Sequence, residues 1–324
     1  MADSKLTALS EISVPALEDL LYLVDDPAGT PASVKVSANR LGGLLTRAAF
    51  GFRLTTESGV PVSTSDRTAQ GTIYLTPYHA SQFCRLISLY DGTRWKLYTN
   101  AEISLALTAS SGSIYDAFVY DNAGTLTLEL SSAWTNDTTR ADALTTQDGI
   151  YVKSGATTRR WVGTIRASGA NVVEDSKNKR FVWNNYNRVR RSLVKMVTAG
   201  TTWTYSTASM RSANADTALR VEAVLGLAES HLSLSTTMLV TSGTLVGVNV
   251  GIGQDSTTVD SADANYRNAV NSGIYNLPRA EMSRIAPLGY HYWQWLEKGA
   301  GSGTQTWGDS DTGSLFGLLG FLEG

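Results

Sequence analysis

The chain has few of the residue types from which reactive and metal sites are most often built. Its 324 residues include one cysteine, Cys84, and three histidines, His79, His231 and His291. A single cysteine excludes an internal disulfide, and no cysteine or histidine recurs at the close spacing of a zinc site. We therefore predict no metal and no cofactor, and we interpret Cys84 as a small buried hydrophobic residue.

Charge is also scarce. Lys and Arg number 27, Asp and Glu number 29, and charged residues make up only 17% of the chain. The formal net charge of −2 provides no overall field that would attract nucleic acid or an anionic membrane. No stretch reaches the roughly 18 apolar residues of a membrane span, and the N-terminus has no signal-peptide pattern. We predict a chain that is made in a cytoplasm and has neither a nucleic-acid nor a membrane partner.

Turn-forming residues, in contrast, are abundant. There are 29 glycines, and Ser, Thr and Asn fill the segments between apolar alternations, which is typical of β proteins with many turns. We predict an all-β fold with a small N-terminal hairpin module and two antiparallel β-sandwich domains of the jelly-roll type. The expected boundaries are 1–48 for the module, 49–190 and 191–298 for the two domains, and 299–324 for a flexible linker with an apolar tail.

Residues 71–98 hold the densest succession of strand and turn signals. Apolar residues alternate with polar ones, and turn residues such as the Asp91-Gly92 pair interrupt the alternation. We expect this stretch to form the core hairpin system of the first domain. Its predicted buried rows comprise Ile73, Leu75, Leu89, Trp95 and Leu97.

The N-terminal module contains two alternating runs, LLYLVDD and ASVKVSA, around the turn DPAGTP. This pattern predicts a hairpin with Leu21 and Leu23 on one face together with Val34 and Val36. A short helix through Leu41 is expected to follow. Because so few large apolar residues cannot stabilise 48 residues alone, we expect the module to dock on a partner or on copies of itself.

Residues 181–196, FVWNNYNRVRRSLVKM, are predicted to bridge the two domains. The asparagine amides can cross-link loops, because each side chain both donates and accepts hydrogen bonds. Arginines beside Trp183 and Tyr186 also suggest nucleic-acid binding. We favour a structural belt between domains, because this is one short basic cluster in a net acidic chain.

The second domain contains a run, 246–253, in which valines and isoleucine alternate with Gly247, Asn249, Gly251 and Gly253. A glycine-bearing face indicates the close approach of another backbone, such as a subunit or sheet contact. Farther along, NYRNAV and RAEMSRI are predicted to be short helical or loop elements. The final strand, LGYHYWQWLEKG, carries Trp293 and Trp295.

Two kinds of binding residue are predicted. Trp293, Trp295 and His291 are a possible glycan platform, although indoles that fill a sandwich core are the favoured alternative. The apolar residues at the two ends of the chain are predicted to form attachment and oligomer interfaces, since such a C-terminal cluster would be an exposed patch in a monomer. These interface residues are Leu21, Leu23, Val34, Val36, Leu41, Leu315, Phe316, Leu319 and Phe321.

Catalysis by paired carboxylates requires an acid and a base at working distance. The candidate pairs all lie in turn-like or strand-edge contexts in which acidic residues are ordinary. We therefore predict no catalytic residues and a protein that is not an enzyme. The pairs considered are Asp116 with Asp121, Glu174 with Asp175, and Asp255 with Asp260.

Long segments of the sequence resemble tailed-bacteriophage proteins. Residues 3–41, with the DDPAGT turn, resemble the short N-terminal module of fibre-like and head- or tail-decorating virion proteins. From Leu54 to Val189, segments such as LTTESGVPVSTSD, ISLYDGTRWKLY and DGIYVKSGATTRRWVGTIRA resemble uncharacterised phage and prophage structural proteins in the same order. GYHYWQWLE extends the resemblance toward the C-terminus.

The resemblance implies a non-enzymatic structural component of a bacteriophage virion: a head fibre, a capsid decoration or a tail fibre protein attached through its N-terminus. Its expected partners are capsid, portal or tail proteins and further copies of itself, with a homotrimer favoured. It would be assembled in the bacterial cytoplasm and released by lysis within the virion. The alternatives are a tail fibre protein that binds a host surface glycan and a tailspike that cleaves one.

Overall fold

The computed structural model describes residues 20–25, 32–37, 47–79, 85–264, 266–270, 273–309 and 316–324. Within these residues the regular structure consists of β-strands and one 3₁₀ turn, Ala213–Ala215. The all-β sandwich class predicted from the sequence is therefore confirmed. No membrane-spanning helix is found in the part of the chain that the structure describes.

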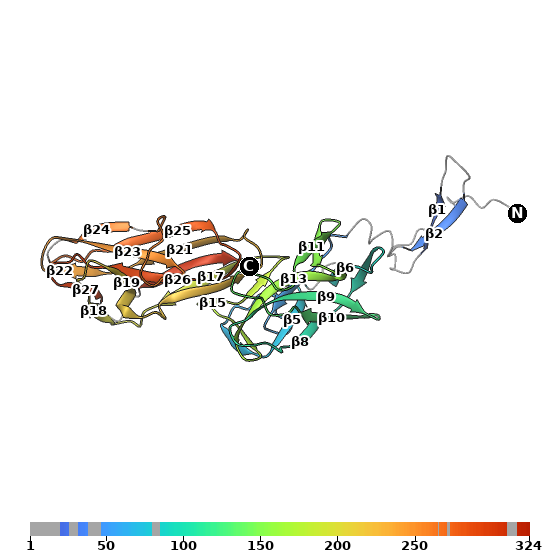
Figure 1. Ribbon diagram of the computed structural model, residues 1–324, viewed down its shortest axis with the longest axis horizontal. Helices are drawn as coiled ribbons and strands as arrows, with labels where there is room; N and C mark the ends of the chain where they lie inside the picture. Colours follow the sequence, from blue (N-terminus) through green and yellow to red (C-terminus); the bar gives the residue numbers. More distant parts are fainter. Residues whose placement is uncertain are drawn as a thin grey trace.

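The N-terminal hairpin consists of β1 (Leu20–Asp25) and β2 (Ala32–Ser37). The strands pair antiparallel, with Leu21 opposite Val36 and Leu23 opposite Val34, so the predicted hairpin and its register are confirmed. The hairpin lies apart from the other strands in Figure 1. Leu41 lies outside the described residues, as does the helix expected through it.

Strands β3 to β16 form what we call the first lobe. Sheet β3-β5-β8 and hairpin β6-β7 lie on one side of an apolar core, and strands β10-β9-β13 lie on the other. The five residues of 71–98 that were predicted to be buried, from Ile73 to Leu97, are all buried in this lobe. The strands are β3 (Phe52–Thr55), β4 (Arg67–Gln70), β5 (Thr72–Pro77), β6 (Leu86–Tyr90), β7 (Trp95–Thr99), β8 (Ile103–Ala106), β9 (Ile114–Asn122), β10 (Thr125–Leu130), β11 (Leu144–Gln147), β12 (Ile150–Lys153), β13 (Ala156–Gly169), β14 (Val172–Asp175), β15 (Lys179–Arg180) and β16 (Val182–Asn184).

Strands β17 to β28 form the second lobe. Sheet β17-β28-β21-β25 packs face to face on strands β20-β26-β23-β24, and sheet β18-β27-β22 closes one end. The strands are β17 (Arg190–Met196), β18 (Thr202–Thr204), β19 (Met210–Ser212), β20 (Arg220–Leu225), β21 (His231–Thr237), β22 (Val240–Ser242), β23 (Val246–Gln254), β24 (Tyr266–Val270), β25 (Arg279–Ile285), β26 (Gly289–Lys298), β27 (Gln305–Gly308) and β28 (Gly317–Glu323).

The two lobes share one sheet. Strand β15 pairs in parallel with β20, so the strand order runs without interruption from β10 in the first lobe to β24 in the second. Figure 1 shows the lobes next to each other along the long axis, with the C-terminus between them. Gly324 is held there by two backbone hydrogen bonds with Val189, of 3.0 and 3.2 Å.

Two predicted elements differ from the structure. NYRNAV and RAEMSRI, expected to be helical or loop segments, form β24 and β25, which pair with β23 and β21. In β25, Ala280 and Met282 are buried while Arg279 and Glu281 are exposed, which is the period of two of a half-buried strand. The helix preference of Glu and Met was therefore overridden by pairing and alternation.

The C-terminal region also differs from its prediction. Instead of a linker followed by a separate apolar cluster, residues 305–308 and 317–323 form β27 and β28. Strand β28 is an inner strand, paired with β17 on one side and β21 on the other. Leu318 and Leu322 consequently lie in the core of the second lobe. Leu315 lies outside the described residues.

The glycine-bearing face of β23 is covered by the chain's own backbone. A Cβ atom on Gly253 would lie 2.6 Å from the carbonyl oxygens of both Ser256 and Val259, and one on Gly251 would lie 2.9 Å from Cβ of Asp260. The close approach predicted from the glycines therefore exists, but the loop that follows β23 makes it, not another subunit or sheet.

We expect Gly253→Ala to lower the free energy of unfolding by about 2 kcal/mol, because two carbonyl groups would have to move to admit the new methyl group. Chemical denaturation measures the change. Gly243→Ala is the matched control, since a Cβ at Gly243 meets nothing within 4 Å. Equal stability of the two variants would contradict the packing described for β23.

Candidate functional site

A buried carboxylate lies at the centre of the first lobe. Asp116, on β9, is 0% exposed. Its oxygens accept hydrogen bonds from four side chains that come from distant parts of the lobe. The donors are Trp161 Nε1 at 2.9 Å, Trp134 Nε1 at 3.0 Å, Thr164 Oγ1 at 2.7 Å and Arg140 Nε at 2.8 Å. A carboxylate so fully bound serves to position its donors, since buried charge is stable only when paired and hydrogen-bonded.

The Asp116 network continues into the second lobe. Arg140 also donates to the carbonyl oxygen of Gly226, in the loop after β20. The Trp161 ring stacks on Trp183 at 5.5 Å, and Trp183 Nε1 donates to Ser230 Oγ at 2.8 Å. Gly226 lies flat against Trp183, where a Cβ would come within 2.5 Å of the ring. The apolar core around these two tryptophans is continuous with that of the second lobe.

A second buried carboxylate, Glu297 on β26, joins segments of the second lobe in a similar way. It is 0% exposed and accepts hydrogen bonds from Trp203 Nε1 at 2.7 Å and Arg211 Nε at 2.8 Å. Burial raises the pKa of Glu297 to about 7, against the opposing effect of these donors. Each lobe thus contains one carboxylate held by an indole and a guanidinium.

Arg160, on β13, is buried among carbonyl groups and aromatic rings. It is 1% exposed, and burial lowers the pKa of its guanidinium. Nη1 donates to the carbonyls of Ser88 at 2.6 Å and Ala49 at 3.1 Å, while Nε donates to the Tyr186 hydroxyl at 3.1 Å. The guanidinium also lies 4.9 Å from the centroid of Phe50. Arg160 thereby fixes the segment through which the chain reaches the first lobe.

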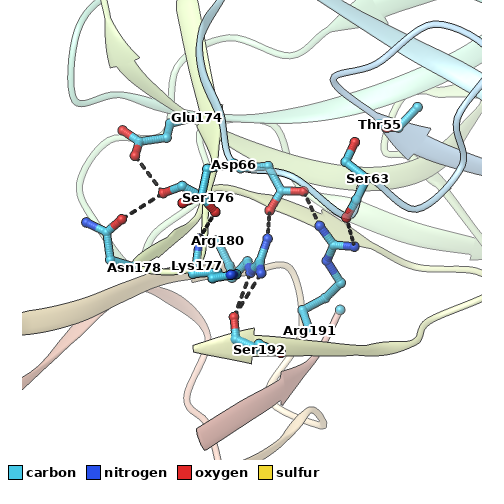
Figure 2. A network of polar contacts seen from close by, with 12 residues as sticks. Thr55, Ser63, Asp66, Glu174, Ser176, Lys177, Asn178, Arg180, Arg191 and Ser192 are labelled. Atoms are coloured by element: carbon cyan, nitrogen blue, oxygen red, sulfur yellow. Dashed lines mark hydrogen bonds and ion pairs between the residues drawn. The ribbon is translucent and has the colours of Figure 1, made fainter. Parts of the chain in front are cut away.

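A cluster of arginines lies between β3, β14, β15 and β17 (Figure 2). Asp175 accepts hydrogen bonds from Arg180 at 2.9 Å and Arg191 at 2.7 Å. Arg53 donates to the carbonyl oxygen of Gly324 at 2.8 Å. Burial, followed by the nearby positive charge of Arg191, lowers the pKa of Arg53 to about 10. The cluster ties the first lobe to β17 and to the C-terminal residue.

Two of the asparagines of residues 181–196 make amide cross-links of the kind predicted, although their partners lie on or just before strand β3 and not in a loop. Asn184 accepts from the backbone N–H of Leu54 at 2.6 Å and donates to the Leu54 carbonyl at 3.1 Å. Asn187 donates to the carbonyls of Phe50 and Phe52, both at 3.0 Å. The predicted amide cross-links are therefore confirmed.

The predicted glycan platform is wrong, because its two indoles are inaccessible. Trp293 and Trp295 are both 0% exposed, and His291 is 8% exposed. They lie on β26, an inner strand with neighbouring strands on both sides. Trp293 and Trp295 belong to the core of the second lobe, so the alternative favoured from the sequence is the observed one.

His291 is held between two acceptors. Nδ1 lies 2.6 Å from Asp255 Oδ2, and Nε2 lies 3.0 Å from the Leu288 carbonyl oxygen. Both ring nitrogens can donate only in the charged imidazolium. Despite burial, these hydrogen bonds raise the pKa of His291, and hydrogen bonds from His291 and the Tyr292 N–H lower the pKa of Asp255.

The acidic residues of the other pairs considered from the sequence have ordinary structural contacts. Asp121 accepts from the Tyr98 hydroxyl at 2.9 Å, and Glu174 accepts from Ser176 Oγ at 2.6 Å. Among the residues with described side chains, no group of three His, Cys, Asp or Glu could hold a metal ion. Cys84 lies outside the described residues.

Two of the predicted interface residues, Leu319 and Phe321, lie on the outward side of sheet β17-β28-β21-β25, which we call the outer face. Leu319 is 39% exposed there, and Phe321 is partly exposed with the Arg190 guanidinium 4.3 Å from its ring. A groove of about 600 Å³ runs along this face beside β28. Phe316, also predicted, is partly buried against the core of the second lobe.

A second exposed apolar region was not predicted from the sequence. Ile274, Tyr275 and Leu277 are 55%, 69% and 57% exposed, and they belong to a loop whose Asn276 exchanges backbone hydrogen bonds with Val240. These apolar residues form a short run in a turn-rich segment, without the period of a strand or of a helix. Hydrophobic periodicity therefore does not predict their exposure.

Comparison with known proteins gives no family. No family model matches the chain, and no curated protein matches it. A glycoside hydrolase family 43 arabinoxylan arabinofuranohydrolase from Bacillus subtilis is similar over 82% of this chain, with 13% identity and a TM-score of 0.21; this chain spans 55% of the hydrolase chain.

Two further solved structures are similar at the same low level. A structure of infectious bursal disease virus, Gt strain, matches 87% of this chain and 77% of its own, with 14% identity and a TM-score of 0.28. A carbohydrate-binding module of the beta-sandwich superfamily matches 83% of this chain and 96% of its own, with 11% identity and a TM-score of 0.21. Structural similarity at TM-scores this low does not indicate a function.

We expect Asp116→Asn to lower the free energy of unfolding by about 3 kcal/mol, because the partly buried Arg140 would lose its counter-charge and the buried donors would lose their charged acceptor. Asp121→Asn, on the same strand, is the matched control and should cause a much smaller loss, since its carboxylate bonds an exposed tyrosine hydroxyl. Urea denaturation of both variants makes the comparison. Similar losses would show that the Asp116 network does not stabilise the lobes.

The His291–Asp255 pair should give a pH-dependent contribution. Its stabilisation is present below the ordinary histidine pKa of 6.5 and is lost as the pH rises through the raised pKa of His291. It is also lost as the pH falls below the ordinary aspartate value of 3.8 and through the lowered pKa of Asp255. We therefore expect Asp255→Asn to cost about 1 kcal/mol near pH 6 and less near pH 9. A cost that is independent of pH would contradict an imidazolium at this position.

Proposed function

We propose that this chain is a non-enzymatic structural component of a bacteriophage virion, held to the particle by its N-terminal module and presenting its two β lobes on the particle surface. The proposal rests mainly on one observation, that the buried ionisable groups are bound by other groups of the fold. Asp116, Arg160 and Asp175 are each bound within the fold to groups that they hold in place. Ionisable groups placed in this way stabilise an assembly component and are not available to a substrate.

The arrangement of the chain supports the same proposal. The hairpin β1–β2 lies apart from the lobes in Figure 1, as an attachment module would. The ordered resemblance to phage structural proteins extends from the module through both lobes. Head fibre, capsid decoration and tail fibre proteins share these requirements, and capsid, portal or tail proteins and further copies of the chain are the proposed partners.

The glycan-binding alternative loses its best support, because the aromatic platform proposed for it is buried. Trp293 and Trp295 cannot contact a sugar ring without unfolding of β26. The cleavage alternative is also weakened, since Asp116 and Glu174 are engaged in hydrogen bonds within the fold. We therefore put forward no second function.

The test is the location of the protein. Mass spectrometry of gradient-purified phage particles should detect the full chain, and antibodies raised against it should label the particle surface in electron microscopy. Deletion of residues 1–48 should abolish incorporation, because the attachment module would be missing. Gly243→Ala in the full chain is the control and should be incorporated normally. Particles that lack the protein, or that incorporate the truncated chain, would contradict the proposal.

A further inference from the structure

The arginine cluster between the two lobes contains more positive than negative charge. Arg53, Arg180 and Arg191 are all buried. Arg180 and Arg191 lie next to each other (Figure 2) and share the carboxylate of Asp175, each bonding one of its oxygens. Arg53 donates only to backbone oxygens, among them that of Gly324. Three buried guanidinium groups therefore face the single carboxylate of Asp175. A terminal carboxylate on Gly324 would still leave one positive charge unbalanced.

The other acidic groups beside the cluster do not supply the missing charge. Glu174 forms an ion pair with Lys179 at 3.4 Å. Asp66 is exposed to solvent, and its carboxylate accepts a hydrogen bond from the backbone N–H of Lys177 at 2.8 Å (Figure 2). The excess positive charge of the buried arginines is therefore not balanced by these neighbours.

A small polar cavity lies within the cluster. Its volume is about 10 Å³, which is room for about one particle of the size of a water molecule. Arg53 lines it from β3 of the first lobe, and Arg191 lines it from β17 of the second. In each guanidinium, Nη1 and Nη2 donate one N–H apiece to protein oxygens, so the second N–H of each nitrogen has no acceptor among the described residues. Asp175 also lines the cavity, with both oxygens already bound to arginines.

A buried hydroxyl group belongs to the same cavity. Ser63 lines it and is 7% exposed, and the Ser63 Oγ has no hydrogen-bond partner in the part of the chain that the structure describes. The other uncharged polar side chains of the lining are satisfied. Thr55 Oγ1 donates to the Val60 carbonyl oxygen at 2.9 Å, and the Asn184 amide bonds both backbone groups of Leu54. A buried hydroxyl without a protein partner indicates a water molecule or an ion beside it.

The size and charge of the cavity select between these occupants. Phosphate, sulfate and carboxylate groups contain several heavy atoms and are too large for a volume of about 10 Å³. A water molecule would fit and could accept from Ser63, but it would leave the excess positive charge unpaired, and unpaired buried charge is costly. A monatomic anion fits the same space, accepts hydrogen bonds and supplies the missing negative charge.

We propose that this cavity binds one monatomic anion, such as chloride, between the guanidinium groups of Arg53 and Arg191 and the hydroxyl of Ser63. Because Arg53 belongs to the first lobe and Arg191 to the second, the ion stabilises the junction of the lobes. It also offsets the repulsion by which Arg191 helps to lower the pKa of Arg53. The inference goes beyond the proposed function, since it holds for the chain inside or outside a virion.

Urea unfolding of the full chain tests the site, with sodium chloride replaced by sodium gluconate at constant ionic strength. Gluconate is too large for the cavity. Chloride should lower the equilibrium constant for unfolding by about tenfold when its concentration is about ten times the dissociation constant, and bromide should act in the same way. An equilibrium constant that is the same in gluconate and in chloride up to about 0.5 M would overturn the proposal.

Two serine variants separate binding from general effects of salt. Ser63→Ala removes a donor to the anion, and because this hydroxyl has no protein partner the variant should fold and should bind chloride about tenfold more weakly. Ser88→Ala is the matched control, since Ser88 on β6 is also buried with an unpartnered hydroxyl but does not line the cavity. It should keep the chloride dependence of the unaltered chain. The same chloride dependence in both variants would count against the site.

Diffraction from crystals grown in sodium bromide locates the ion directly, because bromide scatters anomalously near its absorption edge. The expected result is an anomalous peak between Arg53, Arg191 and Ser63. A water molecule at this position, or a cavity without an anomalous peak, would overturn the proposed anion.

Discussion

The structure depends most on one ion pair, the buried carboxylate of Asp116 with the partly buried guanidinium of Arg140. Removing a carboxylate and a guanidinium from water costs more than their attraction returns unless further hydrogen bonds are made. Asp116 obtains them from two indoles and a threonine, and Arg140 obtains one from the carbonyl of Gly226 in the other lobe. The requirement to satisfy one charge therefore fixes the positions of groups that join both lobes.

The same requirement explains the other buried charges. Arg160 has carbonyl oxygens and aromatic rings around it, and Asp175 has Arg180 and Arg191. Arg160 joins β13 to residues before β3, and Arg191, which binds Asp175, also donates to the carbonyl of Ser63, 128 positions away. A chain folded from many short strands has few long elements to hold it together, so polar cross-links at the boundaries between sheets complement the apolar cores.

The sequence pattern predicted those features of the fold that depend on residues close together in the chain. The N-terminal hairpin, the buried rows of residues 71–98 and the asparagine cross-links followed from alternation, turn residues and amide chemistry. Long-range pairing was not predictable in this way. Glycine-rich residues before β28 looked like a linker, yet the strand returns to lie between β17 and β21. Alternation showed that Trp293 and Trp295 share a face, but it could not show what covers that face. The donors to Asp116 lie 18 to 48 positions away, so no short motif marks the network.

Arg160 has a mechanical consequence for a protein tethered at one end. Tension on the N-terminal module would reach the first lobe at Ala48 and Ala49, whose carbonyls are held by this guanidinium. Arg160 belongs to β13, a strand of 14 residues that is bonded to β9, β12, β14 and β16. A load on Arg160 would therefore be passed to several rows of hydrogen bonds along β13 and would not fall on one edge strand alone.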